Sequence, residues 1–141
     1  MQSVLKAVIV GFVLIWSSIP AQDNQFDARL STVPIDVRNR VQITGQGSAT
    51  AILNGSELTI AGSYEGLQGA ANAAFLHESP VTGVRGPAIL DIDVSGGIEG
   101  SISAALELTP EQVTALRDGR LYIQVHSDAA PDGNLWGWLL Q

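Results

Sequence analysis

Residues 121–140 read LYIQVHSDAAPDGNLWGWLL, and they predict two β-strands joined by a turn. Apolar and polar side chains alternate through the first six residues, which is the period of a strand with one buried face. Residues 131–134, PDGN, favour a turn because proline presets φ and glycine or asparagine accepts a positive φ. Trp136 and Trp138 lie one residue apart in the second strand, so we expect both indoles on the same face of the sheet.

The composition of the 141-residue chain fits one domain and excludes several classes of function. Cysteine is absent, so neither a disulfide nor a thiolate nucleophile is available. The formal net charge is −7, and no run of basic residues occurs. Binding to nucleic acid needs positive charge against phosphate, and the composition therefore argues against it.

Residues 1–21 have the layout of a secretory signal peptide. Lys6 supplies a short positive region, residues 7–16 are apolar, and small residues precede a cleavage point after Ala21. Ten apolar helical residues span about 15 Å, roughly half of the hydrocarbon core of a bilayer, which favours cleavage. The alternative is a retained membrane anchor over residues 4–19, with Lys6 reaching the interface. Both alternatives predict an exported protein, periplasmic or extracellular, and the second tethers it to the cytoplasmic membrane.

Asn54-Gly55 is the clearest local signal, because this pair lies between two alternating runs and favours a β-hairpin. With a two-residue loop at this pair, Leu53 would face Ser56 across the hairpin. We expect the face shared by the apolar residues of both strands to be buried. That face carries Ala51, Leu53, Leu58, Ile60 and Tyr64.

Alternating patterns predict further strands at residues 26–30, 87–94 and 98–108, with a turn at Gly96-Gly97. The last of these strands has a strictly alternating face that we expect to be buried. It consists of Ile98, Gly100, Ile102, Ala104, Leu106 and Leu108.

Residues 110–118 predict the only helix. Thr109 and Gln112 have the spacing of a capping box, and Gly119 ends the helix. Seven or more short strands with one short helix before the C-terminal hairpin predict an all-β domain over residues 22–141. We expect an antiparallel β-sandwich with Greek-key-like connections.

The C-terminal segment resembles the end of the CHRD domain, the repeat first described in chordin. The motif of that family reads YVNVHT, three variable residues and PxGxIRGxL. The matching positions here are Tyr122, Val125, His126, Ser127, Pro131, Gly133, Gly137 and Leu139. The resemblance begins at Phe26 and includes residues 108–122, which are similar to LTxxQxxxLxxGxxY of the family. It implies an extracellular domain that binds protein ligands, although bacterial relatives generally lack a well-defined activity.

His77 and His126 are candidate metal ligands because both lie where a predicted strand ends. Glu78 or Asp128 would supply the third ligand that a metal site usually needs. The family commonly has two histidines in the segment of His77, and Phe75 replaces the first of them. The alternative is that both imidazoles hydrogen-bond to loop backbone, in which case no cofactor is expected.

The sequence does not predict an enzyme. It contains no G-x-S-x-G motif, and the neighbours His126 and Ser127 should point to opposite faces of a strand. Asp91 and Asp93 share one strand face, which we expect to be exposed to solvent.

Tyr122, Trp136 and Trp138 predict an aromatic patch that contacts a protein partner, and core packing is the alternative. Trp136 is the preferred interface residue, because the family usually has a polar residue there. We therefore expect a protein-binding or structural module outside the cytoplasmic membrane. One alternative is an anchored accessory subunit that stabilises the periplasmic face of a respiratory or photosynthetic complex. A weaker alternative is a metal-binding or redox protein that uses His77 and His126.

Overall fold

The computed structural model describes residues 11, 13 and 23–141. Apart from those two isolated positions, the signal peptide or membrane anchor expected at residues 1–21 lies outside the described residues. Within the described part of the chain, no helix is long and apolar enough to cross a membrane.

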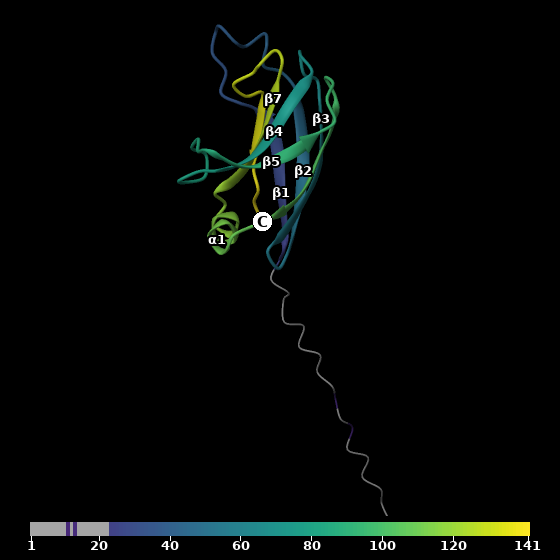
Figure 1. The fold of residues 1–141 in the computed structure, drawn as a ribbon, viewed down its shortest axis with the longest axis vertical. Coiled ribbons are helices and arrows are strands. Elements are labelled where there is room, and N and C mark those ends of the chain that lie inside the picture. Colours follow the sequence, from purple (N-terminus) through teal and green to yellow (C-terminus); the bar gives the residue numbers. More distant parts are fainter. Residues whose placement is uncertain (1–10, 12, 14–22) are drawn as a thin grey trace, which may run out of the picture.

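Residues 23–141 form eight strands and one helix (Figure 1). The strands are β1 (Gln25–Thr32), β2 (Gln46–Asn54), β3 (Glu57–Glu65), β4 (Ala71–Glu78), β5 (Ala88–Val94), β6 (Gly100–Glu107), β7 (Leu121–Ser127) and β8 (Leu135–Trp138). The helix is α1 (Pro110–Arg117). Strand β4 has a weak signal in the sequence, because three of its first four residues are alanine, which is depleted in strands.

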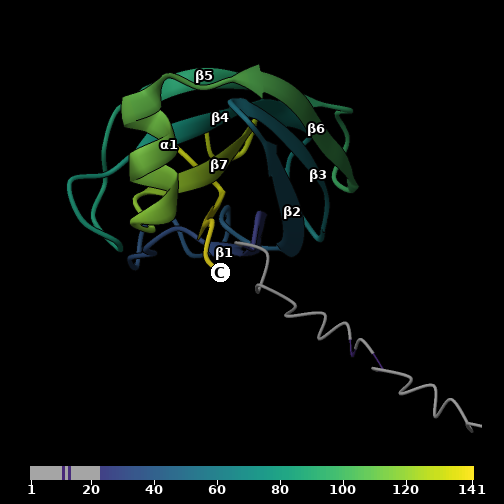
Figure 2. The same ribbon diagram turned by 90° about the horizontal axis from the view of Figure 1, so that it is seen from below.

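The strands form one closed sheet in the order β1-β2-β3-β6-β5-β4-β7-β8. The all-β class with one short helix is confirmed, but a barrel replaces the expected two-sheet sandwich. The barrel closes because Ser31 and Thr32 of β1 pair with Trp136 and Leu135 of β8. Figure 2 shows the strands arranged in a ring, with α1 at the near end. The sequence pattern does not distinguish a sandwich from a barrel, because alternation requires only that one face of each strand is buried, and both architectures bury one face.

Alternate side chains of the strands fill the interior of the barrel. The largest of these that are fully buried are Phe26, Leu30, Leu58, Ile60, Leu76, Ile102, Leu121, Ile123 and Leu135, and Leu139, just after β8, is buried with them. The predicted buried face of the β2–β3 hairpin is confirmed, since none of its five residues is more than 3% exposed. The C-terminal hairpin is confirmed as β7 and β8, which are paired in antiparallel orientation.

The β2–β3 hairpin turns one residue later than expected. Asn54 pairs with Glu57, so the loop residues are Gly55 and Ser56. Gly55 has φ of +65°, and a type II′ turn favours glycine at this first loop position. The difference shifts each cross-strand partner by two residues, which is the side-chain period of a strand. The same side chains therefore remain on the buried face.

Helix α1 closes one end of the barrel. The predicted capping box is present: the Gln112 N–H donates to Thr109 Oγ1 at 3.2 Å, and the Thr109 N–H donates to Gln112 Oε1 at 2.9 Å. Ala115 and Leu116 are 0% exposed and pack into the main core. Gly119 follows the helix with φ of +70°, as expected of a C-terminal stop.

Strand β6 begins at Gly100, two residues later than predicted. Ile98, which we expected to be buried, precedes the strand and is 55% exposed. The preceding Gly96 and Gly97 both have positive φ, and the turn that they begin includes Ile98. The Ile98 carbonyl accepts a hydrogen bond from the Leu67 N–H at 3.1 Å, so this residue belongs to the loop.

Candidate interaction surface on the outside of the barrel

The outer side of β4, β7 and β8 carries a group of neighbouring aromatic rings. His77, Tyr122 and Trp138 are direct neighbours across the three strands. The ring centroids of Trp136 and Trp138 are 4.7 Å apart in an edge-to-face arrangement, which confirms that both indoles project from one face. We call this set the aromatic face; it consists of Phe75, His77, Tyr122, His126, Trp136 and Trp138.

Tyr122 is the centre of the aromatic face, yet only 1% of it is exposed. Its ring stacks on His77 and lies against Trp138, with centroid distances of 4.7 Å in both cases. Trp136 contacts the same ring edge-on at 5.9 Å. Tyr122 therefore departs from the expectation of an exposed interface residue. It supports the two tryptophans, which are half-buried and keep accessible area.

The loop of residues 79–87 covers Tyr122. The Gly86 N–H donates to Tyr122 Oη at 3.0 Å, and the same hydroxyl donates to the Gly86 carbonyl at 3.0 Å. A Cβ on Gly86 would overlap the carbonyl of Glu78, so only glycine permits the loop to approach this closely. This loop buries an aromatic ring outside the main core of the barrel.

The same loop holds both tryptophans in place. The Arg85 guanidinium lies 5.1 Å from the ring centroid of Trp136, within the range of a cation–π contact. Trp138 Nε1–H donates to Ser79 Oγ at 3.3 Å. The exposed parts of both indoles are therefore presented from fixed positions.

The two candidate metal ligands, His77 and His126, lie on either side of Phe75. The centroid of the Phe75 ring is 6.3 Å from the first imidazole and 5.4 Å from the second. With Nδ1 protonated, His77 donates to the Gly86 carbonyl at 2.9 Å and His126 donates to the Pro131 carbonyl at 2.8 Å. Each imidazole thus has a hydrogen bond to loop backbone, as the structural alternative predicts.

The other expected ligands have partners of their own. Arg120 Nη1 donates to Glu78 Oε1 at 3.2 Å, and Asn72 Nδ2 donates to Asp128 Oδ1 at 2.9 Å. Among the described residues, no group of three or more His, Cys, Asp or Glu side chains is arranged to hold a metal ion. A metal ion at His77 and His126 stays a prediction from the sequence.

Burial lowers the pKa of His77 below its ordinary value. The hydrogen bond to the Gly86 carbonyl opposes this shift, while Coulombic interactions with His126 and Arg85 add to it. Nε2 of His77 is buried without a hydrogen-bond partner, so protonation would place a charged N–H in a site with no acceptor. The neutral imidazole is therefore the favoured form in the folded protein.

We expect the protein to lose stability as the pH falls through the ordinary titration range of histidine, near pH 6.5, because of His77. The unfolded chain takes up a proton on this residue near pH 6.5, whereas the folded chain does so only at lower pH. Within that window the unfolded state binds more protons, so the free energy of unfolding decreases as the pH decreases. Thermal unfolding of the wild type and of His77→Gln measures the effect, and the variant should show the smaller slope against pH.

Val37→Ala is the control for this experiment, because Val37 is 82% exposed and lies in a loop before β2. It should keep the wild-type dependence on pH. Equal slopes for the wild type and for His77→Gln would contradict the role of His77.

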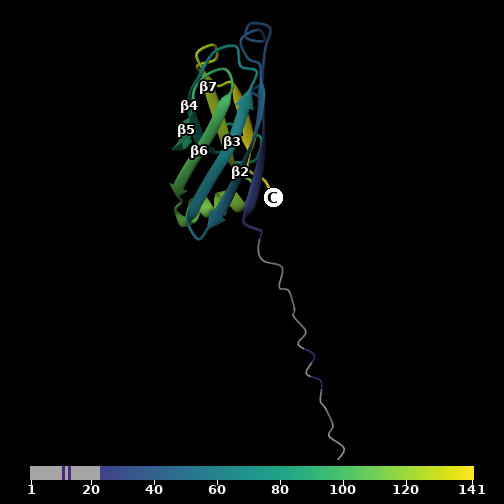
Figure 3. The same cartoon turned by 90° about the vertical axis from the view of Figure 1, so that its right-hand side faces the viewer.

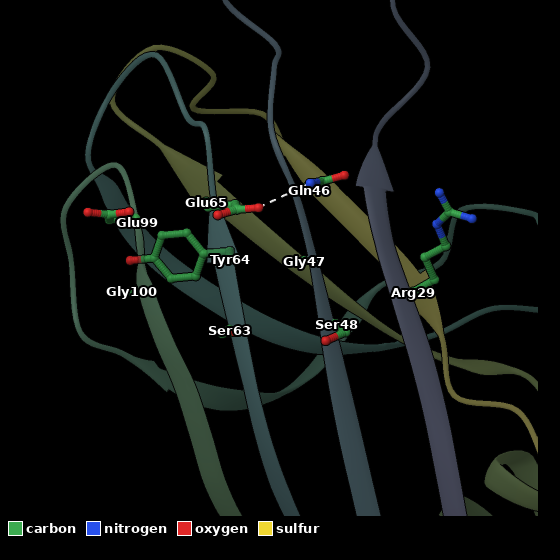
Figure 4. Close-up of a pocket in the computed structure, with 9 residues that line it drawn as sticks. All are labelled: Arg29, Gln46, Gly47, Ser48, Ser63, Tyr64, Glu65, Glu99 and Gly100. Atoms are coloured by element: carbon green, nitrogen blue, oxygen red, sulfur yellow. Dashed lines mark hydrogen bonds between the residues drawn. The ribbon is translucent and has the colours of Figure 1, made fainter.

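Two shallow depressions lie on the outer surface of the barrel, and both are lined in part by β1 and β2. The first has a volume of about 560 Å³, and Figure 4 shows Arg29 on one side of it and Glu65 and Glu99 on the other. The second, about 620 Å³, reaches Trp136 and Trp138. Much of the remaining lining is serine and glycine, which carry no distinctive sequence signal. No residue predicted as a site from the sequence lines the first depression.

His126 and Ser127 point to opposite faces of β7, as expected. Ser127 is 0% exposed and donates to Asn134 Oδ1 at 2.7 Å, whereas His126 lies on the aromatic face.

The sequence did not predict that Arg85 contacts the aromatic face. Its loop has no periodic pattern, so no sequence signal placed it against a tryptophan.

These features define a small antiparallel β-barrel domain with a supported aromatic patch on its outer side. The chain belongs to the CHRD domain family, whose model matches residues 26–139, from the start of β1 to just beyond β8. The resemblance in the C-terminal motif is thereby confirmed. Comparison with curated proteins and with solved structures gave no match.

Proposed function

We propose that this CHRD-domain protein is an exported, non-enzymatic module that binds a protein partner through its aromatic face. The observation that carries the proposal is the pair Trp136 and Trp138, half-exposed and held by Tyr122 and Arg85. Tryptophan, tyrosine and arginine are the residues most enriched at the energetic centres of protein interfaces. Side chains that are already fixed lose less conformational entropy on binding, which favours affinity.

The hydrogen bonding around the aromatic face supports binding rather than catalysis. The Nδ1 atoms of His77 and His126 are both within hydrogen-bond distance of backbone carbonyls. The only serine next to a histidine, Ser127, is buried and bonded to the side chain of Asn134. A nucleophilic hydroxyl needs a general base within reach, and Ser127 donates to an amide oxygen instead.

The double variant Trp136→Ala/Trp138→Ala should lower the recovery of the protein partner at least tenfold, because truncating a central interface tryptophan costs about 2 kcal/mol or more. The measurement is a quantitative pull-down from native membrane and extracellular fractions with wild-type and variant protein. The expected result is one reproducible partner that the wild type retains and the variant does not.

The matched control is Val37→Ala/Val41→Ala, which removes two exposed apolar side chains, neither of which belongs to the aromatic face. It should recover the partner as well as the wild type does. Undiminished recovery with the tryptophan variant would reject the aromatic face as the binding surface.

The alternative is a membrane-anchored accessory subunit, in which residues 4–19 hold the barrel at the periplasmic face of a membrane complex. It uses the same aromatic face, so the state of the N-terminus distinguishes the two forms. The intact mass of the native protein provides the test, since loss of residues 1–21 excludes the anchor.

A metal-binding role for His77 and His126 is the weaker proposal, and metal analysis of the purified protein tests it.

A further inference from the structure

The barrel is closed unevenly between β5 and β6. These strands pair only at Asp93 with Ser103 and at Val94 with Ile102, close to the turn that connects them. In contrast, β6 pairs with β3 over eight residue pairs, and Figure 3 shows the two strands side by side. Residues 88–91 of β5 and 104–107 of β6 therefore have a strand partner on one side only. We call the region between these two segments the seam.

The seam is bordered by unpaired backbone groups of β6. The Ser95 N–H donates to the Ser101 carbonyl, so the odd-numbered residues of β6 direct their backbone groups toward β5. Ala105 and Glu107 continue this series beyond the last paired residue. In residues 23–141 neither has a backbone hydrogen bond on the β5 side. An unpaired strand edge is a template for another strand.

Apolar side chains that face the barrel interior are incompletely covered at the seam. Leu90, Ala104 and Leu106 are only half-buried, although they occupy inward positions. On the adjacent strand β3, the corresponding Leu58 and Ile60 are at most 1% exposed. Removing this apolar surface from water would favour binding of a covering segment.

The outer side of the seam is acidic. Asp91, Asp93 and Glu107 are exposed on its borders, and neither β5 nor β6 contains lysine or arginine. These carboxylates would therefore attract a covering segment that carries basic side chains at its outward positions. In an extended strand, outward and inward positions alternate.

We infer that the seam accepts an extended strand from a protein partner, with apolar residues facing the core and lysine or arginine at the alternate, outward positions. The backbone of the strand pairs with β6 at Ala105 and Glu107, as in other cases of strand addition to a sheet edge. Its apolar residues cover Leu90 and Leu106. This surface borders the aromatic face where Asp91 pairs with Phe75, but it does not include Trp136 or Trp138 and goes beyond the function proposed for them.

The test uses a fluorescent eight-residue peptide of alternating valine and lysine and the folded protein. Fluorescence anisotropy should show saturable binding. Amide hydrogen exchange should slow at Ala105 and Glu107 when the peptide is bound, because their N–H groups gain acceptors. Absence of binding, or binding without this protection, would overturn the inference.

Two altered peptides separate strand pairing from general attraction. The same sequence with N-methylated backbone amides and a version with glutamate in place of lysine should both bind at least tenfold more weakly. Equal binding of the N-methylated peptide would reject backbone pairing. Protection of Ala105 and Glu107 in the protein alone that rises with its concentration would assign the seam to a second copy of the chain instead.

The charge-reversed variant Asp91→Lys/Asp93→Lys should bind the valine–lysine peptide at least tenfold more weakly and the valine–glutamate peptide more tightly. Both positions are exposed, so the fold should be kept, and circular dichroism checks this. Trp136→Ala/Trp138→Ala should bind the peptide as the wild type does. This variant separates failure of the seam from failure of the aromatic face.

Discussion

Gly137→Ala should lower the free energy of unfolding by about 3 kcal/mol. Gly137 occupies an inward position of β8, the strand that closes the barrel against β1. A Cβ there would overlap the carbonyl oxygen of Arg29 and lie 2.9 Å from its carbonyl carbon. These atoms belong to the backbone of β1, which cannot rotate aside as a side chain can. The two strands must therefore separate, and urea unfolding followed by circular dichroism measures the loss.

Gly83→Ala provides the matched control for this prediction. Gly83 has φ of +90°, and a Cβ there would meet no atom within 4 Å. The substitution therefore imposes only the conformational cost of a positive φ, about 1–2 kcal/mol. Equal losses for the two variants would show that backbone overlap at the β1–β8 closure is not the cause.

Tyr122→Ala should lower the free energy of unfolding by about 3–5 kcal/mol, the cost of truncating a buried aromatic residue. The ring is 1% exposed and contacts His77, Trp136 and Trp138. Its loss leaves a cavity under both tryptophans and removes the hydroxyl that binds Gly86. We therefore also expect a shift of tryptophan fluorescence to longer wavelength in the folded variant, because water reaches the indoles.

Tyr122→Phe separates the ring from its hydroxyl. It keeps the contacts with the tryptophans and leaves the Gly86 N–H without its acceptor, at a cost of about 1–3 kcal/mol. The tryptophan emission should stay close to that of the wild type. A loss as large as that of Tyr122→Ala would mean that the hydroxyl, and not ring packing, holds the aromatic face together.

The candidate site was predictable where its geometry follows from a single strand. Trp136 and Trp138 share a face because side chains two residues apart in a strand point the same way. The burial of Tyr122 was not predictable, since it depends on a loop more than 30 residues earlier in the chain. The lowered pKa of His77 was not predictable either, because it results from burial in the folded protein and from Coulombic interactions with His126 and Arg85.

Local signals decided most of the secondary structure. The capping box at Thr109 and Gln112 began α1 as predicted, because both partners lie within one helical turn. The hairpin after Asn54 kept its buried face even though its turn moved by one residue, since the strand period is two. These outcomes depend on neighbours in the chain and need no knowledge of the rest of the fold.

By itself, the sequence determined that the domain is all-β, that its final hairpin carries two tryptophans on one face, and that a short capped helix precedes that hairpin. Only the tertiary structure decided that the sheet closes into a barrel, that Tyr122 lies beneath those tryptophans, and that β5 and β6 diverge at the seam. The physical reason is the range of the interactions. Side-chain periodicity and capping act over a few residues, whereas closure of the barrel depends on pairing between its first and last strands, about 100 residues apart in the chain.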